Sequence, residues 1–204
     1  MSNNPEMSDE EKDVANLFAT ITLHKLEVIK SIEFQNKLKD FKGKIGKSLE
    51  KPAACKMIAR NGGTKVFKEV YKILEENISV KVEGGVDIDF VKLFDSPDWK
   101  ELFQVYWSFL YWLWSLTSDC EEMCKDFVQN DGIELACDVL KKKDVFDYTK
   151  DDKKTVFKIP NAHMGMLINV LQNVNEIFSV GERLRNLNII GILNPYLNSS
   201  YVIS

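Results

Sequence analysis

The chain has 204 residues, of which 45% are apolar and 28% are charged, and its formal net charge is −4. The apolar fraction is enough to fill a core, which excludes an intrinsically disordered chain, and the length suits one domain. Because the net charge is negative, the chain offers no overall basic footprint for phosphate groups, and we expect no nucleic-acid partner.

The first residues, Met1 to Met7, are polar and contain a proline, so they do not resemble a signal peptide. Without entry to an oxidising compartment, the four cysteines are expected to be reduced thiols. These two observations predict a cytoplasmic location, with the nucleus left open.

Helical patterning begins at a capping box, Ser8 to Glu11, in which each residue's side chain is expected to bond the other's backbone N–H. The pattern continues to about Glu50, with a break expected near Gly43 and Gly46. Pro52 suits the first turn of the next helix, since its missing N–H is not needed there. Residues 1–50 are therefore assigned to an N-terminal helical segment.

The middle of the chain contains one clear helix and one ambiguous stretch. Apolar residues recur on one helical face from Thr64 to Glu76. From Ile78 to Val86 apolar and polar residues alternate, but an isolated strand would have no partner, so a loop is expected. Asp89 to Phe94 is predicted to form a helical turn. Ser96 and Pro97 are expected to start a long helix as N-cap and first helical residue.

That long helix contains an uncharged run, Leu102 to Ser118, which is shorter than the roughly 20 residues of a membrane span. A buried helix is expected instead, and no membrane partner. A second capping box, Ser118 to Glu121, is predicted to separate it from the next helix. Lys141 to Pro160, rich in Lys and Asp, is read as a long loop, and Ala162 to Phe178 as the next long helix.

Two segments of the chain repeat each other. CKMIARNGG followed by TKVFKEV, starting at Cys55, matches CKDFVQNDG followed by IELACDV, starting at Cys124. A weaker match sets Leu113 on Leu171, which places Ser115 opposite Asn173. Self-similarity of this kind is typical of solenoids, whose units bury their apolar faces against neighbours.

The predicted elements follow one order: a short helix, a long apolar helix, a turn and a long helix. This order predicts an all-α, armadillo-like right-handed helical solenoid over residues 51–204. The apolar end, Tyr201 to Ser204, predicts that the repeat array is truncated there.

No catalytic or metal site is expected. Gly43 to Ser48 resembles the end of a phosphate-binding loop, but the preceding glycine and strand are missing. A metal site would have to use Cys120, Cys124, Cys137 and His163; no CxxC pair occurs, and Cys124 repeats Cys55, which has no second cysteine near it. His24 and His163 lie on apolar patterns and are read as core residues. We therefore expect no cofactor and no enzyme.

Two features leave alternatives open. The lysines between Lys37 and Lys47 form either a solvated face or a site for an acidic partner. Asn169 and Asn173 interrupt an apolar helix, and a buried amide must be paired. These amides either bond a neighbouring helix or, as in armadillo arrays, bond the backbone of an extended peptide.

The sequences LWSLTSDCEEMCKDFVQNDGIEL, from Leu113, and LINVLQNVNEI, from Leu167, resemble the armadillo-like repeats of the ZYG/ZER proteins. The resemblance covers about residues 55–204. That family provides substrate receptors of cullin-RING ubiquitin ligases, whose armadillo domain binds small N-terminal residues such as glycine. The resemblance implies a protein or peptide partner, with ligase components reached only through parts of a longer protein.

The family's pocket motif is Trp-Asn-Leu-Thr-Asp on one helix and Asn-x-x-Glu on the next long helix. Trp114, Asn173 and Glu176 match it, whereas Ser115 and Ser118 stand where the family has Asn and Asp. The resemblance implies that Glu176 pairs with a terminal amine and Trp114 walls the pocket. The competing reading is a non-catalytic scaffold or oligomerisation domain of a larger signalling protein.

Overall fold

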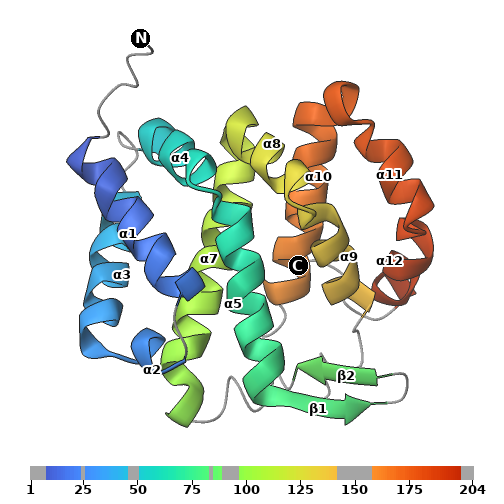
Figure 1. Cartoon of the computed structure of the whole chain (residues 1–204). Helices are drawn as coiled ribbons and strands as arrows, with labels where there is room; N and C mark the ends of the chain where they lie inside the picture. Colours follow the sequence, from blue (N-terminus) through green and yellow to red (C-terminus); the bar gives the residue numbers. More distant parts are fainter. Residues whose placement is uncertain are drawn as a thin grey trace.

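The computed structural model describes residues 8–23, 26–45, 51–82, 85–88, 97–141 and 158–198, and these are helical apart from one short hairpin (Figure 1). In chain order the elements are α1 (Asp9–Leu23), α2 (Leu26–Ile29), α3 (Ile32–Ile45), α4 (Lys51–Arg60), α5 (Gly63–Ile78), β1 (Ser79–Val82), β2 (Gly85–Ile88), the 3-10 turn η1 (Pro97–Trp99), α7 (Lys100–Asp119), α8 (Glu121–Gln129), α9 (Gly132–Lys141), α10 (Lys158–Phe178), α11 (Val180–Asn186) and α12 (Ile189–Asn198).

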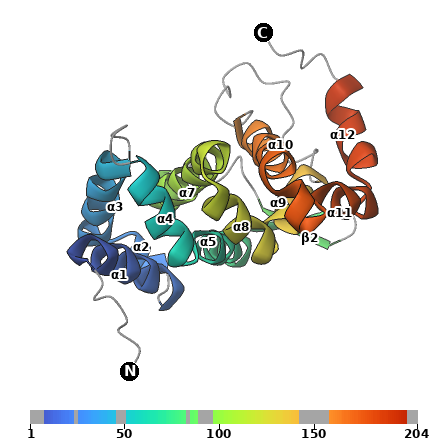
Figure 2. The same cartoon turned by 90° about the horizontal axis from the view of Figure 1, so that it is seen from above.

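The helices form consecutive groups that lie in a row (Figure 2). The group α4–α5–α7 packs against the group α8–α9–α10, with α11 and α12 at the far end and α1 to α3 at the near end. Helices that occupy equivalent positions in successive groups pack against each other: α4 packs on α8, α7 on α10, and α9 on α12. The long helices α7 and α10 therefore lie side by side on one face of the row.

The two short-helix pairs share their burial pattern and their turn. When Cys55 is set on Cys124, Ile58 falls on Phe127 and Val70 on Val139, and all of these side chains are buried. The turns between the helices match as well. Gly62 and Asp131 both have positive φ, 72° and 57°, and the preceding residues Asn61 and Asn130 both donate their side-chain amides to a carbonyl one turn back. A left-handed residue thus ends both first helices of these pairs.

The long helices α7 and α10 also share a burial pattern. With Leu102 set on Ile159, buried positions coincide at Val105 and Ala162, Tyr106 and His163, Phe109 and Met166, Leu113 and Val170, and Thr117 and Val174. This register differs by one residue from the sequence match that set Leu113 on Leu171. The sequence match aligned similar residue types. The alignment by burial instead matches the positions at which each helix faces the core.

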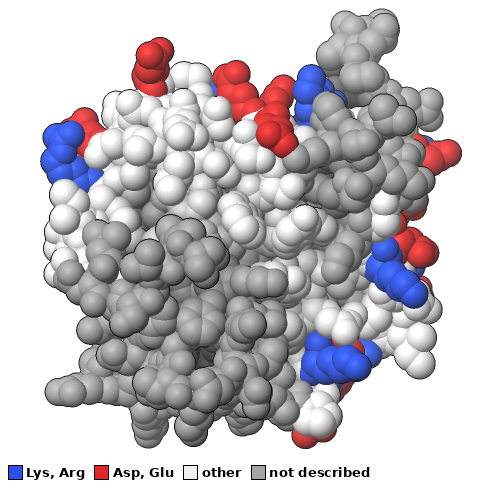
Figure 3. Space-filling model, turned by 180° about the vertical axis from the view of Figure 1, so that it is seen from behind, with Lys and Arg blue, Asp and Glu red and all other residues white. Residues whose placement is uncertain are grey.

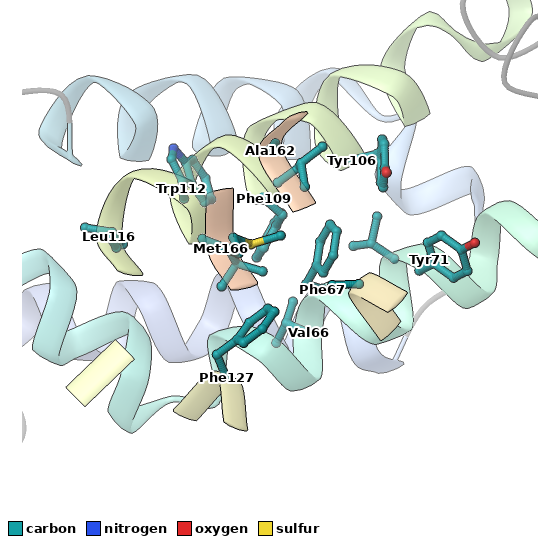
Figure 4. Close-up of a cluster of buried hydrophobic side chains, with 14 of the residues drawn as sticks. Val66, Phe67, Tyr71, Tyr106, Phe109, Trp112, Leu116, Phe127, Ala162 and Met166 are labelled. Atoms are coloured by element: carbon teal, nitrogen blue, oxygen red, sulfur yellow. The ribbon is translucent and has the colours of Figure 1, made fainter. Parts of the chain in front are cut away.

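The core runs through the row between these helices. Phe67 of α5, Phe109 of α7 and Met166 of α10 point toward one another in the middle of it (Figure 4). The rings of Phe67 and Tyr106 stack with their centroids 5.7 Å apart. Aromatic residues supply much of the apolar area here, so the contact between α5, α7 and α10 is a major source of stability.

The loop expected from Ile78 to Val86 is wrong. β1 and β2 form an antiparallel hairpin in which Ser79 pairs with Ile88 and Val82 with Gly85. The alternation of the sequence did indicate a strand, and the missing partner lay only a few residues further on. The helical turn predicted for Asp89 to Phe94 lies outside the described residues.

The first capping box is confirmed and the second is wrong. The Ser8 hydroxyl accepts the Glu11 N–H at 3.2 Å, and Glu11 accepts the Ser8 N–H at 3.3 Å. Ser118 instead continues α7 and donates its hydroxyl to the carbonyl of Ser115 at 2.7 Å. The N-cap of α8 is Cys120, which makes no side-chain cap bond.

Other helix boundaries also differ from expectation. The N-terminal segment has an unexpected break at Lys30 and Ser31. Gly43 lies inside α3, which ends at Ile45, and Gly46 lies outside the described residues. The Ser31 hydroxyl accepts the Phe34 N–H and starts α3. Pro97 opens a 3-10 turn, and α7 begins at Lys100. Pro52 lies in the first turn of α4 as predicted.

The expectation that all four cysteines are free thiols is wrong for Cys55 and Cys120, which form a disulfide with their Cα atoms 6.5 Å apart. Cys55 does occupy the same buried position as Cys124, but α4 lies against the start of α8, where Cys120 sits one turn before Cys124. Cys124 and Cys137 are free and buried. Reduced thiols therefore no longer support a cytoplasmic location for this chain.

None of the helices that the structure describes is both long enough and apolar enough to cross a membrane.

Candidate functional site

The candidate site lies along the contact between α7 and α10. Trp114, half-buried on α7, packs against Gly165 of α10: a Cβ added at Gly165 would lie only 2.3 Å from the indole nitrogen. The absence of a side chain at Gly165 therefore lets the Trp114 ring approach the backbone of α10. The sequence match to a pocket tryptophan did not predict this partner, although a glycine inside an apolar helix is a sign of close approach.

Asn169 and Asn173 hold the same two helices together. The Asn169 amide donates to the carbonyl of Trp114 at 3.3 Å and to the hydroxyl of Thr117 at 3.1 Å. The Asn173 amide donates to the carbonyl of Thr117 at 3.2 Å. Both carbonyls belong to the last two turns of α7, and that of Thr117 is among the final four, which lack a helical N–H partner four residues on. Of the two roles left open by the sequence, the structure shows the bond to a neighbouring helix.

The remaining predicted residues are Ser115 and Ser118 of α7 and Glu176 of α10. Ser115 is half-buried, lies one helical turn after Tyr111, and its carbonyl accepts the Ser118 hydroxyl. Ser118 and Glu176 are both exposed and lie at the same end of the helix pair as the bond between Asn173 and Thr117. The structure thus brings Trp114 and Asn173 into the contact between α7 and α10, while Ser115, Ser118 and Glu176 lie at the same end of the two helices.

We call the outward side of this helix pair the α7–α10 face; it comprises the exposed or half-exposed residues Trp107, Tyr111, Trp114, Ser118, Asn161, Ile168, Gln172 and Glu176. Tyr111 and Ile168 are 48% and 53% exposed, unusually open for large apolar side chains, and they occupy the same position when Leu102 is set on Ile159. The sequence did not single out Tyr111 or Ile168. Their matching exposure becomes evident only when the structure shows which side of each helix faces the core.

The α7–α10 face has few charges. Neither helix carries a charged residue from Leu102 to Ser118 or from Ile159 to Asn175. Seen from behind, the visible upper part of this side of the molecule is uncharged, and acidic side chains line its upper edge (Figure 3). Glu176 lies at that end of the α7–α10 face, and no other described side chain forms an ion pair with it.

Burial makes the titratable groups near this contact unreactive. It raises the pKa of the Cys124 thiol, whose Sγ lies 3.1 Å from the carbonyl of Thr117, to about 11, and the pKa of Cys137 also to about 11. It lowers the pKa of His163 to about 4. A thiol must ionise to attack or to bind a metal, so these cysteines suit packing and not catalysis.

Within the described ranges, no three His, Cys, Asp or Glu side chains come close enough together to hold a metal ion.

Comparison with family models, with curated proteins and with solved structures found no match for this chain.

Proposed function

We propose that this chain is an armadillo-like helical repeat domain that binds an extended segment of another protein, a peptide or a protein N-terminus, on the α7–α10 face. Three features support the repeat organisation: the matching burial of α4–α5 and α8–α9, the matching burial of α7 and α10, and the left-handed residues at Gly62 and Asp131. Solenoids of this kind use their stacked long helices as binding surfaces.

The observation that carries the binding function is the composition of the α7–α10 face. Tyr111 and Ile168 expose apolar area beside the half-buried rings of Trp107 and Trp114, while Ser118 and Gln172 add polar groups. Aromatic residues that are exposed in a cluster and flanked by polar groups are typical of protein interaction sites. The same residues offer no nucleophile paired with a base, so binding fits them better than catalysis.

The resemblance to the ZYG/ZER proteins supports a narrower form of the proposal, substrate recognition for a cullin-RING ubiquitin ligase. In that form the carboxylate of Glu176 pairs with the terminal amine of the partner, and Trp114 limits the size of its first side chain. The exposed position of Glu176 at the acidic end of the face is compatible with this role.

A binding titration with short peptides tests both forms. Peptides beginning with Gly, Ser or Ala, each with a free or an acetylated amine, are titrated against the wild type, Tyr111→Ala and Glu176→Ala. We expect Glu176→Ala to weaken binding of the free peptides about tenfold, because a charge-assisted hydrogen bond is lost. Acetylation should have a similar effect on the wild type and none on Glu176→Ala.

Glu182→Ala is the matched control, since Glu182 is an exposed carboxylate on α11, outside the α7–α10 face. Equal binding of free and acetylated peptides would contradict a pocket for the terminal amine. If Tyr111→Ala still weakened binding in that case, the α7–α10 face would bind internal segments of a peptide. Binding that is unaffected by Tyr111→Ala would contradict the face itself.

One observation supports the alternative, that the chain is a non-catalytic scaffold or oligomerisation domain. Both amides that were candidates for peptide binding donate to α7, and the Trp114 ring packs on Gly165, so these groups already stabilise the helix pair. If no peptide binds and Asn173→Leu lowers the melting temperature, the α7–α10 contact is structural and the scaffold reading is the better one.

A further inference from the structure

Helix α4 is anchored by fewer buried side chains than its counterpart α8. Among the described side chains of α4, only Cys55 and Ile58 are buried, whereas five residues of α8 are buried. With Cys55 set on Cys124, Ile58 stands where α8 has the larger Phe127. One of the two buried anchors of α4 is thus a cysteine of the disulfide, so α4 depends on that bond more than α8 does.

Ion pairs at the surface also connect α4 to its neighbours. Lys56 pairs with Glu122 of α8 at 3.7 Å, and both side chains are about half exposed. Arg60, which is 70% exposed, pairs with Glu11 of α1 at 3.5 Å. Exposed ion pairs contribute little to stability, so these two do not substitute for the disulfide.

Solvent reaches the disulfide from the side of Cys120. Cys120 is half-buried and forms the junction between α7 and α8, whereas Cys55 is only 1% exposed. The carboxylate of Glu122 lies 3.6 Å from the Cys120 sulfur, and its side chain is 50% exposed, so the surroundings of this sulfur are open. A dissolved thiol therefore meets the sulfur of Cys120 first.

The two free cysteines do not compete for this bond. Cys124 and Cys137 are buried, and burial raises the pKa of both thiols to about 11. A thiol attacks a disulfide as its thiolate, so neither residue exchanges readily with the bond near neutral pH. Cleavage therefore requires a thiol from outside the chain.

We propose that the bond between Cys55 and Cys120 is a redox switch, which a dithiol reductant opens in the folded protein so that α4 is released from α8. The thiolate of the reductant attacks the sulfur of Cys120, the S–S bond breaks, and the electron pair leaves with the sulfur of Cys55, which takes up a proton. The second thiol of the reductant then displaces Cys120, which leaves as a thiol. Two electrons and two protons pass to the protein, and the reductant becomes a disulfide.

The release is local, because the centre of the core does not pass through α4. Phe67, Phe109 and Met166, which meet there, belong to α5, α7 and α10. α8 also keeps its bond to α5, since Asp126 accepts the Thr64 N–H at 2.8 Å. The inference does not depend on the proposed binding function, because it concerns only the contact between α4 and α8.

Hydrogen exchange of the full oxidised chain tests this switch, with and without dithiothreitol and without denaturant. Reduction should speed up exchange in α4 about tenfold or more and leave α9 and α10 protected. The double variant Cys55→Ala and Cys120→Ser is the control. Its α4 should exchange as fast as that of the reduced wild type, whether or not dithiothreitol is present.

A monothiol identifies the sulfur that is attacked. Glutathione added to the folded chain should stop at a mixed disulfide, which peptide mapping should find on Cys120 with Cys55 free. Removal of dithiothreitol and addition of oxidised glutathione should restore slow exchange in α4.

Four results would overturn the inference: a bond that is reduced only in denaturant, a mixed disulfide on Cys55, an α4 that stays protected after reduction, or exchange that speeds up along the whole chain. The last of these would show that the disulfide supports the entire fold and that no separate release of α4 occurs.

Discussion

His163 is buried where α10 meets α5 and α7, and its chemistry is set by that position. Its Nδ1–H donates to the carbonyl of Ile159 at 2.8 Å, and no described residue bonds Nε2. The ring lies near that of Phe67, with centroids 6.2 Å apart. Burial disfavours the charged imidazolium and lowers the pKa of His163 to about 4. The sequence expectation of a core histidine is confirmed for His163, whereas His24 lies outside the described residues.

This pKa makes the stability of the fold depend on pH. The unfolded chain protonates this histidine near pH 6.5, so between pH 6.5 and 4 the unfolded state binds more protons than the folded state. Stability contributed by His163 is complete above pH 6.5 and falls by about 3 kcal/mol as the pH approaches 4. Urea unfolding at several pH values measures this loss.

The control for this measurement is His163→Leu, because the raised pKa of Asp126 has the opposite effect on stability. Burial raises the pKa of Asp126, which accepts the Thr64 N–H at 2.8 Å, so protonation of Asp126 favours the folded state on acidification. Subtracting the profile of His163→Leu isolates the histidine. Parallel profiles of the wild type and the variant would contradict the assignment.

For single residues, the sequence identified which side chains lie at the α7–α10 contact better than it identified what each of them bonds. The pattern around Trp114 and Asn173 selected residues that lie at the contact between α7 and α10, but it left open whether the amide bonds a neighbouring helix or a peptide. An amide has donors and an acceptor, and which group it bonds depends on the distance to a helix more than fifty residues away in the chain, which the pattern does not contain. Ser118 shows the same limit, since a capping-box pattern does not reveal that the helix continues.

Among the elements, α4 and α8 are joined both by packing and by the disulfide between Cys55 and Cys120. The bond closes a long loop, with a sequence separation of 65 residues, that contains α5, the hairpin and α7. A crosslink of that size is expected to stabilise the fold by about 4 kcal/mol, chiefly by restricting the unfolded chain. The double variant Cys55→Ala and Cys120→Ser should lose this amount in urea unfolding.

Addition of a reducing agent should lower the stability of the wild type and leave that of the double variant unchanged. Thiol titration of the unreduced, denatured chain should find two free thiols, from Cys124 and Cys137. Four free thiols would show that the bond does not form.

The sequence predicted most helices well because each must bury an apolar stripe, and that spacing is local. α5 follows its predicted span closely, whereas α10 begins at Lys158, four residues before the predicted start and inside the segment that was expected to be a loop. The prediction failed for the hairpin, because β1 and β2 lie within one short stretch of the sequence. Only the pairing of the two strands distinguishes a hairpin from a loop, and the sequence pattern does not show that pairing.

For the whole molecule, α11 and α12 are held to the rest of the row by a charged contact as well as by apolar packing. Arg183 bonds both carboxylate oxygens of Glu134, at 2.5 and 2.6 Å, and donates to the carbonyl of Val128 at 3.0 Å. Their side chains are 31% and 33% exposed, so the pair is only partly desolvated. Such a bidentate contact between helix groups fixes their relative position as well as their distance.

Arg183→Met, which keeps the apolar stem of the side chain, should cost about 1 to 2 kcal/mol of stability. Because each helix group contacts mainly its neighbours, hydrogen exchange should speed up in α11 and α12 while α4 and α5 stay protected. Arg185→Met, an exposed arginine on the same helix, is the control and should change neither region. Uniform deprotection along the row would instead indicate that the molecule opens as one cooperative unit.

The order of the helix groups could be expected from the match of Cys55 to Cys124, because both segments end their first helix at the same left-handed turn. The contact between groups could not. Arg183 and Glu134 are 49 residues apart in the sequence, and they meet only because the long helix α10 brings the chain back toward the turn between α8 and α9.

The bond between Cys55 and Cys120 also decides how this chain would respond to mechanical tension. If the two ends of the chain are pulled apart, the force passes from α4 directly to the start of α8, and the residues between the two cysteines carry none of it. Unfolding by force would therefore lengthen the chain by roughly 220 Å less than its residue count implies, given the separation of 65 residues. The contact of α7 with α10 would be loaded only through its side chains, whereas α11 and α12 would bear the load along their own backbone.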